Sequence, residues 1–167
     1  MMVGIVEALA GAAKPWSELY DKQPVVQGAV TFLHLAGILA AGGLAVAADR
    51  ATIRAAGRSP DERGMALREL GSIHRPVVIG LALVVASGVL LLLSDVESLL
   101  PSPVYWAKMG AFLLLLVNGL LMQRAEARLA GAAPGAENWG SLRGAAWRSA
   151  FLWFATLLLG TILPLAA

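Results

Sequence analysis

Long apolar blocks separated by short polar segments dominate the pattern of this chain. Four blocks, at residues 25–48, 77–94, 104–122 and 145–166, consist almost entirely of hydrophobic and small residues. Each block is about 18–24 residues long, close to the roughly 20 that a helix needs to cross the hydrocarbon core of a bilayer. The pattern therefore predicts an all-α integral membrane four-helix bundle, a single transmembrane domain over residues 1–167.

The segment before the first block predicts a short helix of a different kind. Its apolar residues share one helical face, as is typical of a helix lying in the membrane interface: Val3, Val6, Leu9 and Ala10. Pro15 is expected to end this interfacial helix. Pro24 then opens the first span, where its missing N–H costs nothing.

A second short helix is predicted between the first two spans. Ser59 as N-cap, Pro60 at the first helical position and Glu62 at the third form a helix start with a capping box. Residues 60–73 alternate apolar side chains with Arg and Glu, which predicts an amphipathic cytoplasmic helix. Since Pro76 removes a backbone hydrogen bond, we expect a break at residues 74–75 and a second span that starts afresh at Pro76.

Charge distribution sets the predicted orientation. Only 14% of the residues are charged and the mean hydropathy is +0.72, whereas a soluble domain carries about a quarter charged residues. The connections at 49–75 and 124–148 hold all ten arginines, and the other side holds the three lysines. The positive-inside rule then places both termini outside a bacterial inner (cytoplasmic) membrane. This topology accounts for the net positive charge and gives no reason to expect nucleic-acid binding.

Cysteine is absent from the sequence. Its absence excludes disulfides, iron–sulfur clusters, covalently attached haem and thiolate metal sites. Polar residues inside the spans are costly in lipid and tend to face the bundle interior, so they carry the functional information. They are few: His34, Ser87, Lys108, Asn118, Thr156 and Thr161, with Asp49 and His74 near the inner boundary.

Depth decides which of these side chains meet. At about 1.5 Å per residue, His34 lies about 14 Å below the outer surface and Lys108 about 6 Å below it. The antiparallel neighbours present Ser87 and Thr156 at the level of His34, as hydrogen-bond partners for its second ring nitrogen.

His74 lies about 15–20 Å deeper than His34, at the inner interface of a core about 30 Å thick. Only a strongly tilted macrocycle would let both histidines bind one haem. His74 is otherwise expected to pair with Asp49, or to lie on the surface beside Arg75.

Two interpretations of His34 stay open. It is either an interior histidine that hydrogen-bonds across helices, or an axial ligand to the iron of a b-type haem in the outer leaflet. In the second case Lys108 is a second ligand or the partner of a haem propionate; otherwise it extends its ammonium group to the outer interface. The small residues after His34 (Gly37, Ala40, Ala41, Gly42 and Gly43) would admit a flat porphyrin, or they serve close helix packing.

A family resemblance adds to this picture. The first span carries His34-Leu35, Gly37, Gly42-Gly43 and a closing Asp49-Arg50, and the third span opens with Trp106 two residues before Lys108. These features resemble small bacterial haem-associated membrane proteins, including the HemJ-type protoporphyrinogen oxidases and the CopD-like membrane domain. Related uncharacterised membrane proteins are similar in a Lys followed by an Asn ten residues on (Lys108, Asn118) and in a late Leu-Trp pair (Leu152-Trp153). They usually have Gly-Arg near the end of the last span, where this chain has Gly160-Thr161.

The resemblance implies association with haem b, and it maps a functional His–Lys pair onto His34 and Lys108. The expected function is electron transfer in the membrane between the quinone pool and an outer-side redox partner. The alternative is a non-catalytic anchor or accessory subunit of a larger membrane complex, with other subunits or further copies of the chain as partners. Whether the protein is an enzyme stays open. The candidate cofactor-binding residues are His34, Lys108, Ser87, Thr156 and His74.

Overall fold

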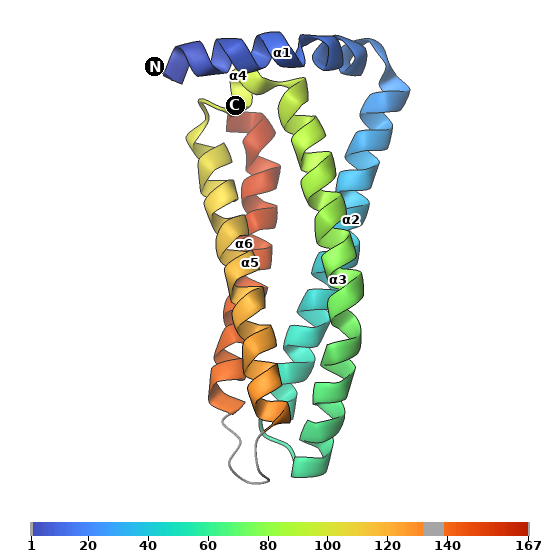
Figure 1. Ribbon diagram of the computed structural model, residues 1–167, viewed down its shortest axis with the longest axis vertical. Helices are drawn as coiled ribbons and strands as arrows, with labels where there is room; N and C mark the ends of the chain where they lie inside the picture. The colour runs from blue at the N-terminus through green and yellow to red at the C-terminus, as the bar shows by residue number, and fades with distance from the viewer. Residues whose placement is uncertain (1, 132–138, 167) are drawn as a thin grey trace.

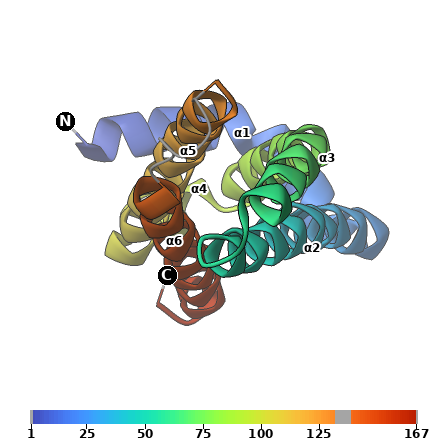
Figure 2. The same cartoon turned by 90° about the horizontal axis from the view of Figure 1, so that it is seen from below.

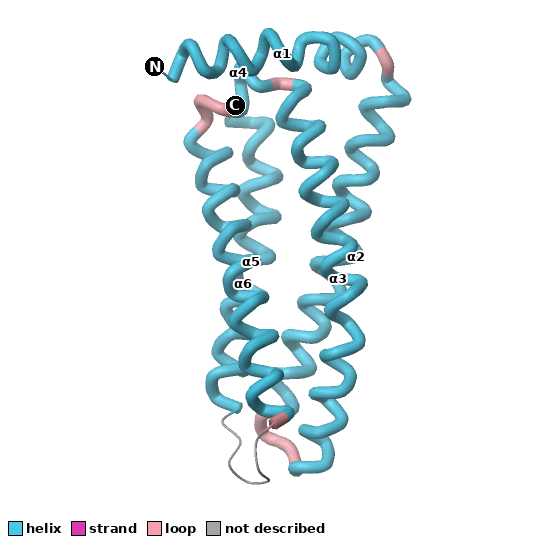
Figure 3. The backbone as a smooth tube through the Cα atoms, viewed as in Figure 1, coloured by secondary structure: helices cyan, strands magenta, loops and turns pink. Residues whose placement is uncertain are grey.

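The computed structural model describes residues 2–131 and 139–166, and over these ranges the secondary structure is helical. The helices are α1 (Met2–Lys22), α2 (Pro24–Ala55), α3 (Pro60–Ser94), α4 (Val96–Leu99), α5 (Pro103–Ala130) and α6 (Trp139–Ala166). Helices α2, α3, α5 and α6 are each long and apolar enough to cross a membrane. They run side by side along the long axis, as Figures 1 and 3 show. The predicted all-α fold with four helices of membrane-spanning length is thereby confirmed.

The four long helices form two antiparallel pairs. Helix α2 packs along α3, and α5 packs along α6, while α2 and α6 join the pairs. Helices α3 and α5 touch at few positions. Figure 2, along the bundle, shows the two pairs as separate groups. The junction between α3 and α5 is therefore the loosest part of the bundle.

Small residues bring α2 and α3 together. A Cβ atom added at Gly37 would lie 2.9 Å from Val84 Cγ2, and one at Gly80 would lie 2.9 Å from the Cβ of Ala41. A Cβ atom added at Gly42 would lie 3.1 Å from the ring of Trp153 on α6. These small residues are thus covered by neighbouring helices, which favours the packing interpretation of the Gly- and Ala-rich stretch.

Helix α1 lies across one end of the bundle, called here the α1 end (Figure 1). The prediction that it ends at Pro15 is wrong, because the helix continues to Lys22. Packing on both sides of Pro15 outweighs the one backbone bond that the ring removes. Ala13 is buried, and Trp16 Nε1 donates to the carbonyl of Leu90 on α3 at 2.8 Å.

Helix α3 begins as predicted and then departs from the prediction. The backbone N–H of Ser59 donates to Glu62 Oε2 at 3.1 Å, and its hydroxyl donates to the same oxygen at 2.9 Å. The expected break at residues 74–75 is wrong, since α3 runs without interruption through Pro76. Residues 60–73 are its first part, not a separate helix. Pro76 removes one bond, whereas Leu70 and Gly80 on either side are buried against the bundle.

The end of the bundle opposite α1, called here the far end, holds the larger core. Leu142 and Ala146 of α6 are fully buried there, with Trp139, Leu129 and Leu70 packed around them. Helix α5 extends past its apolar block to Ala130, so the first part of the predicted connection at 124–148 is helical. Residues 132–138 of that connection lie outside the described residues. The single turn α4, N-capped by Asp95, which accepts from the Ser98 N–H at 3.3 Å, was not predicted.

Candidate functional site

The polar residues of the spans gather in two clusters at different levels. The first, the His34 cluster, lies in the half of the bundle nearer the α1 end and comprises His34, Ser87, Lys108 and Thr156. The second, the Asp49 cluster, lies nearer the far end and comprises Asp49, His74, Glu126 and Ser149. Thirteen residues of α3 separate Ser87 from His74, about 20 Å at 1.5 Å per residue. The two histidines therefore belong to separate sites, as the predicted difference in depth requires.

The imidazole of His34 is held by a hydroxyl on α3, and the backbone of Val84 on the same helix also interacts with it. His34 Nδ1 lies 3.0 Å from Ser87 Oγ, and Ser87 Oγ in turn donates to the carbonyl of Leu83 at 2.6 Å. A hydroxyl has one hydrogen, so when that hydrogen goes to Leu83, His34 is the donor through Nδ1–H. The other ring nitrogen, Nε2, then keeps its lone pair. Ser87, predicted as a partner of His34, takes that role.

Two glycines shape the space around the His34 cluster. A Cβ atom at Gly88 would lie 3.3 Å from His34 Cε1, so the ring rests on the bare backbone of α3. A Cβ atom at Gly160 would lie 3.6 Å from Lys108 Nζ, so the lysine side chain rests on α6. The ammonium group of Lys108 acts on His34 through its charge, with no hydrogen bond between the two among the described residues. His34 of one helix pair and Lys108 of the other therefore share the same half of the bundle.

Thr156, the fourth predicted member, makes no hydrogen bond to His34. Its Oγ1 is buried and has no hydrogen-bond partner within the part of the chain that the structure describes. A buried hydroxyl without a partner is costly. The Thr156 hydroxyl is therefore a buried polar group in this half of the bundle whose hydrogen-bonding capacity is not met by the described residues.

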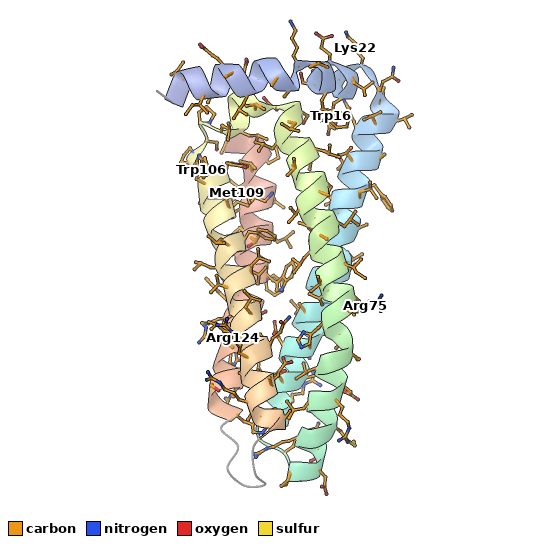
Figure 4. All side chains as sticks on the ribbon, in the orientation of Figure 1. Trp16, Lys22, Arg75, Trp106, Met109 and Arg124 are labelled. Carbon is orange, nitrogen blue, oxygen red and sulfur yellow. The ribbon has the colours of Figure 1, made fainter. Side chains whose placement is uncertain are left out.

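His74 pairs with a residue that the sequence did not single out. Its Nε2 lies 2.6 Å from Glu126 Oε2, which joins α3 to α5. The predicted pairing with Asp49 is wrong, whereas the surface alternative is met in part, since 35% of the His74 side chain is exposed. Arg75 is exposed, near the same height as Arg124 (Figure 4). Glu126 escaped notice because it lies in a charged stretch that reads as solvent-facing, yet only 10% of its side chain is exposed.

Asp49 is the most deeply buried charged residue of the Asp49 cluster, with 2% of its surface exposed. Its carboxyl interacts with the Ser149 hydroxyl and with the Glu126 carboxyl. Oδ2 of the same carboxyl has no hydrogen-bond partner among the described residues. A buried carboxyl with a free oxygen costs folding free energy and is a common feature of functional sites in membrane spans.

A cavity of about 500 Å³ adjoins these groups between α3 and α5, closed behind by α2 and α6. Asp49, His74, Glu126 and Ser149 line it together with many apolar side chains, among them Leu81, Leu115 and Trp153. No pattern within one helix predicts this cavity, because the gap depends on how loosely α3 and α5 pack. The residues of the His34 cluster line neither this cavity nor the two others beside Trp147 and Leu67.

Asn118 belongs to neither cluster. Its amide donates to the carbonyl of Ala145 at 2.9 Å and accepts from Arg148 Nε at 3.2 Å. These bonds join α5 to α6.

Comparison with other proteins adds no name to these sites. No protein-family model, no curated protein and no solved structure matches the chain.

Proposed function

We propose that this protein binds haem b through His34 and takes part in electron transfer within the membrane. The observation that carries the proposal is the orientation of the His34 ring by Ser87. Metal-ligating histidines almost always donate the N–H of their second nitrogen to a neighbouring oxygen, which fixes the tautomer and raises the basicity of the ligating nitrogen. His34 has this arrangement inside an apolar helix, with Nε2 left as the ligating atom.

One further feature of the surroundings supports a haem. Lys108 supplies a cation in the same half of the bundle, as a second ligand or as the partner of a propionate. Gly88 and Gly160 themselves pack against the imidazole and the lysine. The haem would supply one-electron transfer, a common role of such centres. His34, Ser87 and Lys108 would hold and orient it. Gly37, Ala41 and Gly42 do not contribute, because α3 and Trp153 cover them.

The orientation in the membrane is part of the same proposal. All ten arginines lie in or next to the connections at 49–75 and 124–148, at the far end, and positive-inside topology puts that end in the cytoplasm. The α1 end then faces outward, with helix α1 lying along the outer interface. The His34 cluster would in that case exchange electrons with a partner on the outer side of the inner membrane.

An absorption spectrum tests the proposal. Protein produced with ample haem and purified in mild detergent is expected to show a Soret band that His34→Ala abolishes. His74→Gln is the matched control: it removes the other histidine and should leave the band intact. Ser87→Ala should weaken haem retention by about 10- to 100-fold, the usual effect of losing such an outer partner.

A colourless wild-type preparation would contradict the proposal, as would a Soret band that survives in His34→Ala. The second result would place a haem away from His34. The first would favour the alternative of an accessory or anchor subunit, in which the His34–Ser87 bond only holds α2 against α3. That alternative predicts a partner subunit that copurifies after mild solubilisation.

A further inference from the structure

The cavity between α3 and α5 opens sideways, toward the surface that faces lipid. Val78 of α3 and Leu120 of α5 both line it, and they are 54% and 56% exposed. These residues mark its mouth, whereas Asp49 and Trp153 lie behind them and are buried. A molecule dissolved in the bilayer would therefore reach the cavity without leaving the hydrocarbon.

The inner wall of the cavity is polar at one end only. At that end the His74–Glu126 pair lies beside the Asp49 carboxyl. Asp49 is 98% buried, and its Oδ2 has no hydrogen-bond partner among the described residues. The remaining wall is almost wholly apolar. This division suits a ligand with a compact polar head and an apolar tail, and a volume of about 500 Å³ is within the usual range of ligand pockets.

The His74–Glu126 pair also faces a second hollow. A more open groove of about 370 Å³, formed by α3 and α5 at the far end, is lined by His74, Gln123 and Glu126 as well as by Leu67 and Ala130. The pair therefore stands between the lipid-facing cavity and a groove close to the polar end of the bundle. An imidazole hydrogen-bonded to a carboxylate in that position is able to pass a proton between the groove and the cavity.

From these features we infer that the cavity binds the head group of a lipid-soluble quinone. The carbonyl oxygens of a quinone accept hydrogen bonds, and the hydroxyl groups of a quinol donate them. Asp49, His74 and Glu126 are able to do either, depending on which of them holds a proton. The isoprenoid tail would leave between Val78 and Leu120 into the bilayer.

A quinone fits this cavity better than other lipid-soluble molecules for one reason, which is that its head group gains and loses protons. The cavity holds three side chains that can carry a proton, and two of them, His74 and Glu126, also line the more open groove at the far end. The inference rests on the proposed function only in assigning the protein to membrane electron transfer. It concerns a separate site, about 20 Å along α3 from Ser87, and it is testable in protein that holds no haem.

Trp153 provides the readout, because it lines the cavity and quinones quench indole fluorescence. Decylubiquinone titrated into the purified His34→Ala protein should quench the fluorescence saturably. Trp153→Phe should remove most of the saturable part. Asp49→Asn and Glu126→Gln, both nearly isosteric, should each weaken binding at least tenfold, as judged on variants whose thermal unfolding midpoint is unchanged or higher.

A variant at the mouth keeps the test independent of folding. Leu120→Trp adds bulk at an exposed, lipid-facing position and should block binding. The matched control is Leu121→Trp, on the same helix and 46% exposed, which lines a different cavity and should bind as well as the parent protein.

Three results would overturn the inference: quenching that does not saturate, equal binding of decylbenzene, or preferential binding of the lipophilic cation tetraphenylphosphonium. The first would mean partition into the micelle, the second a purely apolar cavity, and the third a site for cations. Because the parent protein of this titration lacks His34, failure here leaves the haem proposal standing, and absence of a Soret band leaves this inference standing.

Discussion

The two histidines of this protein are each held by one polar side chain on a neighbouring helix, yet their settings differ. His34 bonds to Ser87 within the α2–α3 pair, where glycines let the backbones approach closely. His74 bonds to Glu126 across the α3–α5 junction, where the helices meet at few positions. The first bond closes a packed interface, and the second lies beside a cavity. Whether a polar side chain in a span lies in a closed interface or beside a cavity therefore depends on how tightly its two helices pack, more than on its residue type.

The largest effect is expected where the close packing itself is disturbed. Gly80 lies on α3 between Ser87 and His74, and a Cβ atom there would come within 3.0 Å of the Ala41 backbone nitrogen. Gly80→Ala should destabilise the bundle by about 1–3 kcal/mol, the usual cost of overpacking. Thermal unfolding in detergent measures it. Gly43→Ala, which meets nothing within 4 Å, is the control and should not lower the midpoint.

The His74–Glu126 pair should show the next largest effect. A double-mutant cycle with His74→Gln and Glu126→Gln is expected to give a coupling of about 1–2 kcal/mol, because the pair is short and the glutamate is nearly buried. The partial exposure of the histidine, 35% of its side chain, keeps the value below that of a fully buried pair. A coupling near zero would mean that the two groups do not meet in the membrane.

Asn118 provides a polar contact outside both regions. Asn118→Ala removes two hydrogen bonds between α5 and α6 and should cost about 1 kcal/mol, in line with interhelical hydrogen bonds measured in membranes. Unfolding in detergent again gives the value. Both the Soret band and quinone quenching should survive this change; loss of either would show that the sites respond to any weakening of the bundle.

The smallest effect is expected at the His34–Ser87 bond. A cycle with His34→Gln and Ser87→Ala should give a coupling of about 0.6 kcal/mol in haem-free protein, the average for such bonds. The Ser87 hydroxyl can keep its bond to Leu83 when the imidazole is gone. If this coupling exceeds that of His74 with Glu126, the contrast between a closed interface and an open cavity is wrong.

Several features of the molecule follow from single residues and short patterns. The four apolar blocks predict four helices because a helix is the simplest way to satisfy every backbone group in lipid. Ser59, Pro60 and Glu62 predict the start of α3 because a capping box needs only residues close in sequence. Helical rise along antiparallel spans was enough to match His34 with Ser87.

Other features of the structure could not be predicted from local sequence patterns. Pro15 and Pro76 were expected to interrupt helices, but tertiary packing on both sides of each holds the helix continuous. Glu126 was overlooked because neighbouring arginines made its stretch appear solvent-facing. His74 pairs with Glu126 and not with Asp49. This pairing depends on how α5 is rotated relative to α3, which cannot be predicted from the pattern of a single helix.

By itself, the sequence determined the class of the protein, its four long helices and the level of each polar residue along them, because hydropathy and helical rise are properties of one segment at a time. The tertiary structure alone decided that α2 pairs with α3 and α5 with α6, and that the junction of α3 with α5 stays loose. From that looseness come the cavity, the exposed mouth at Val78 and Leu120, and the buried carboxyl of Asp49 at its polar end. A cavity belongs to no single helix, so only the packing of all four creates it.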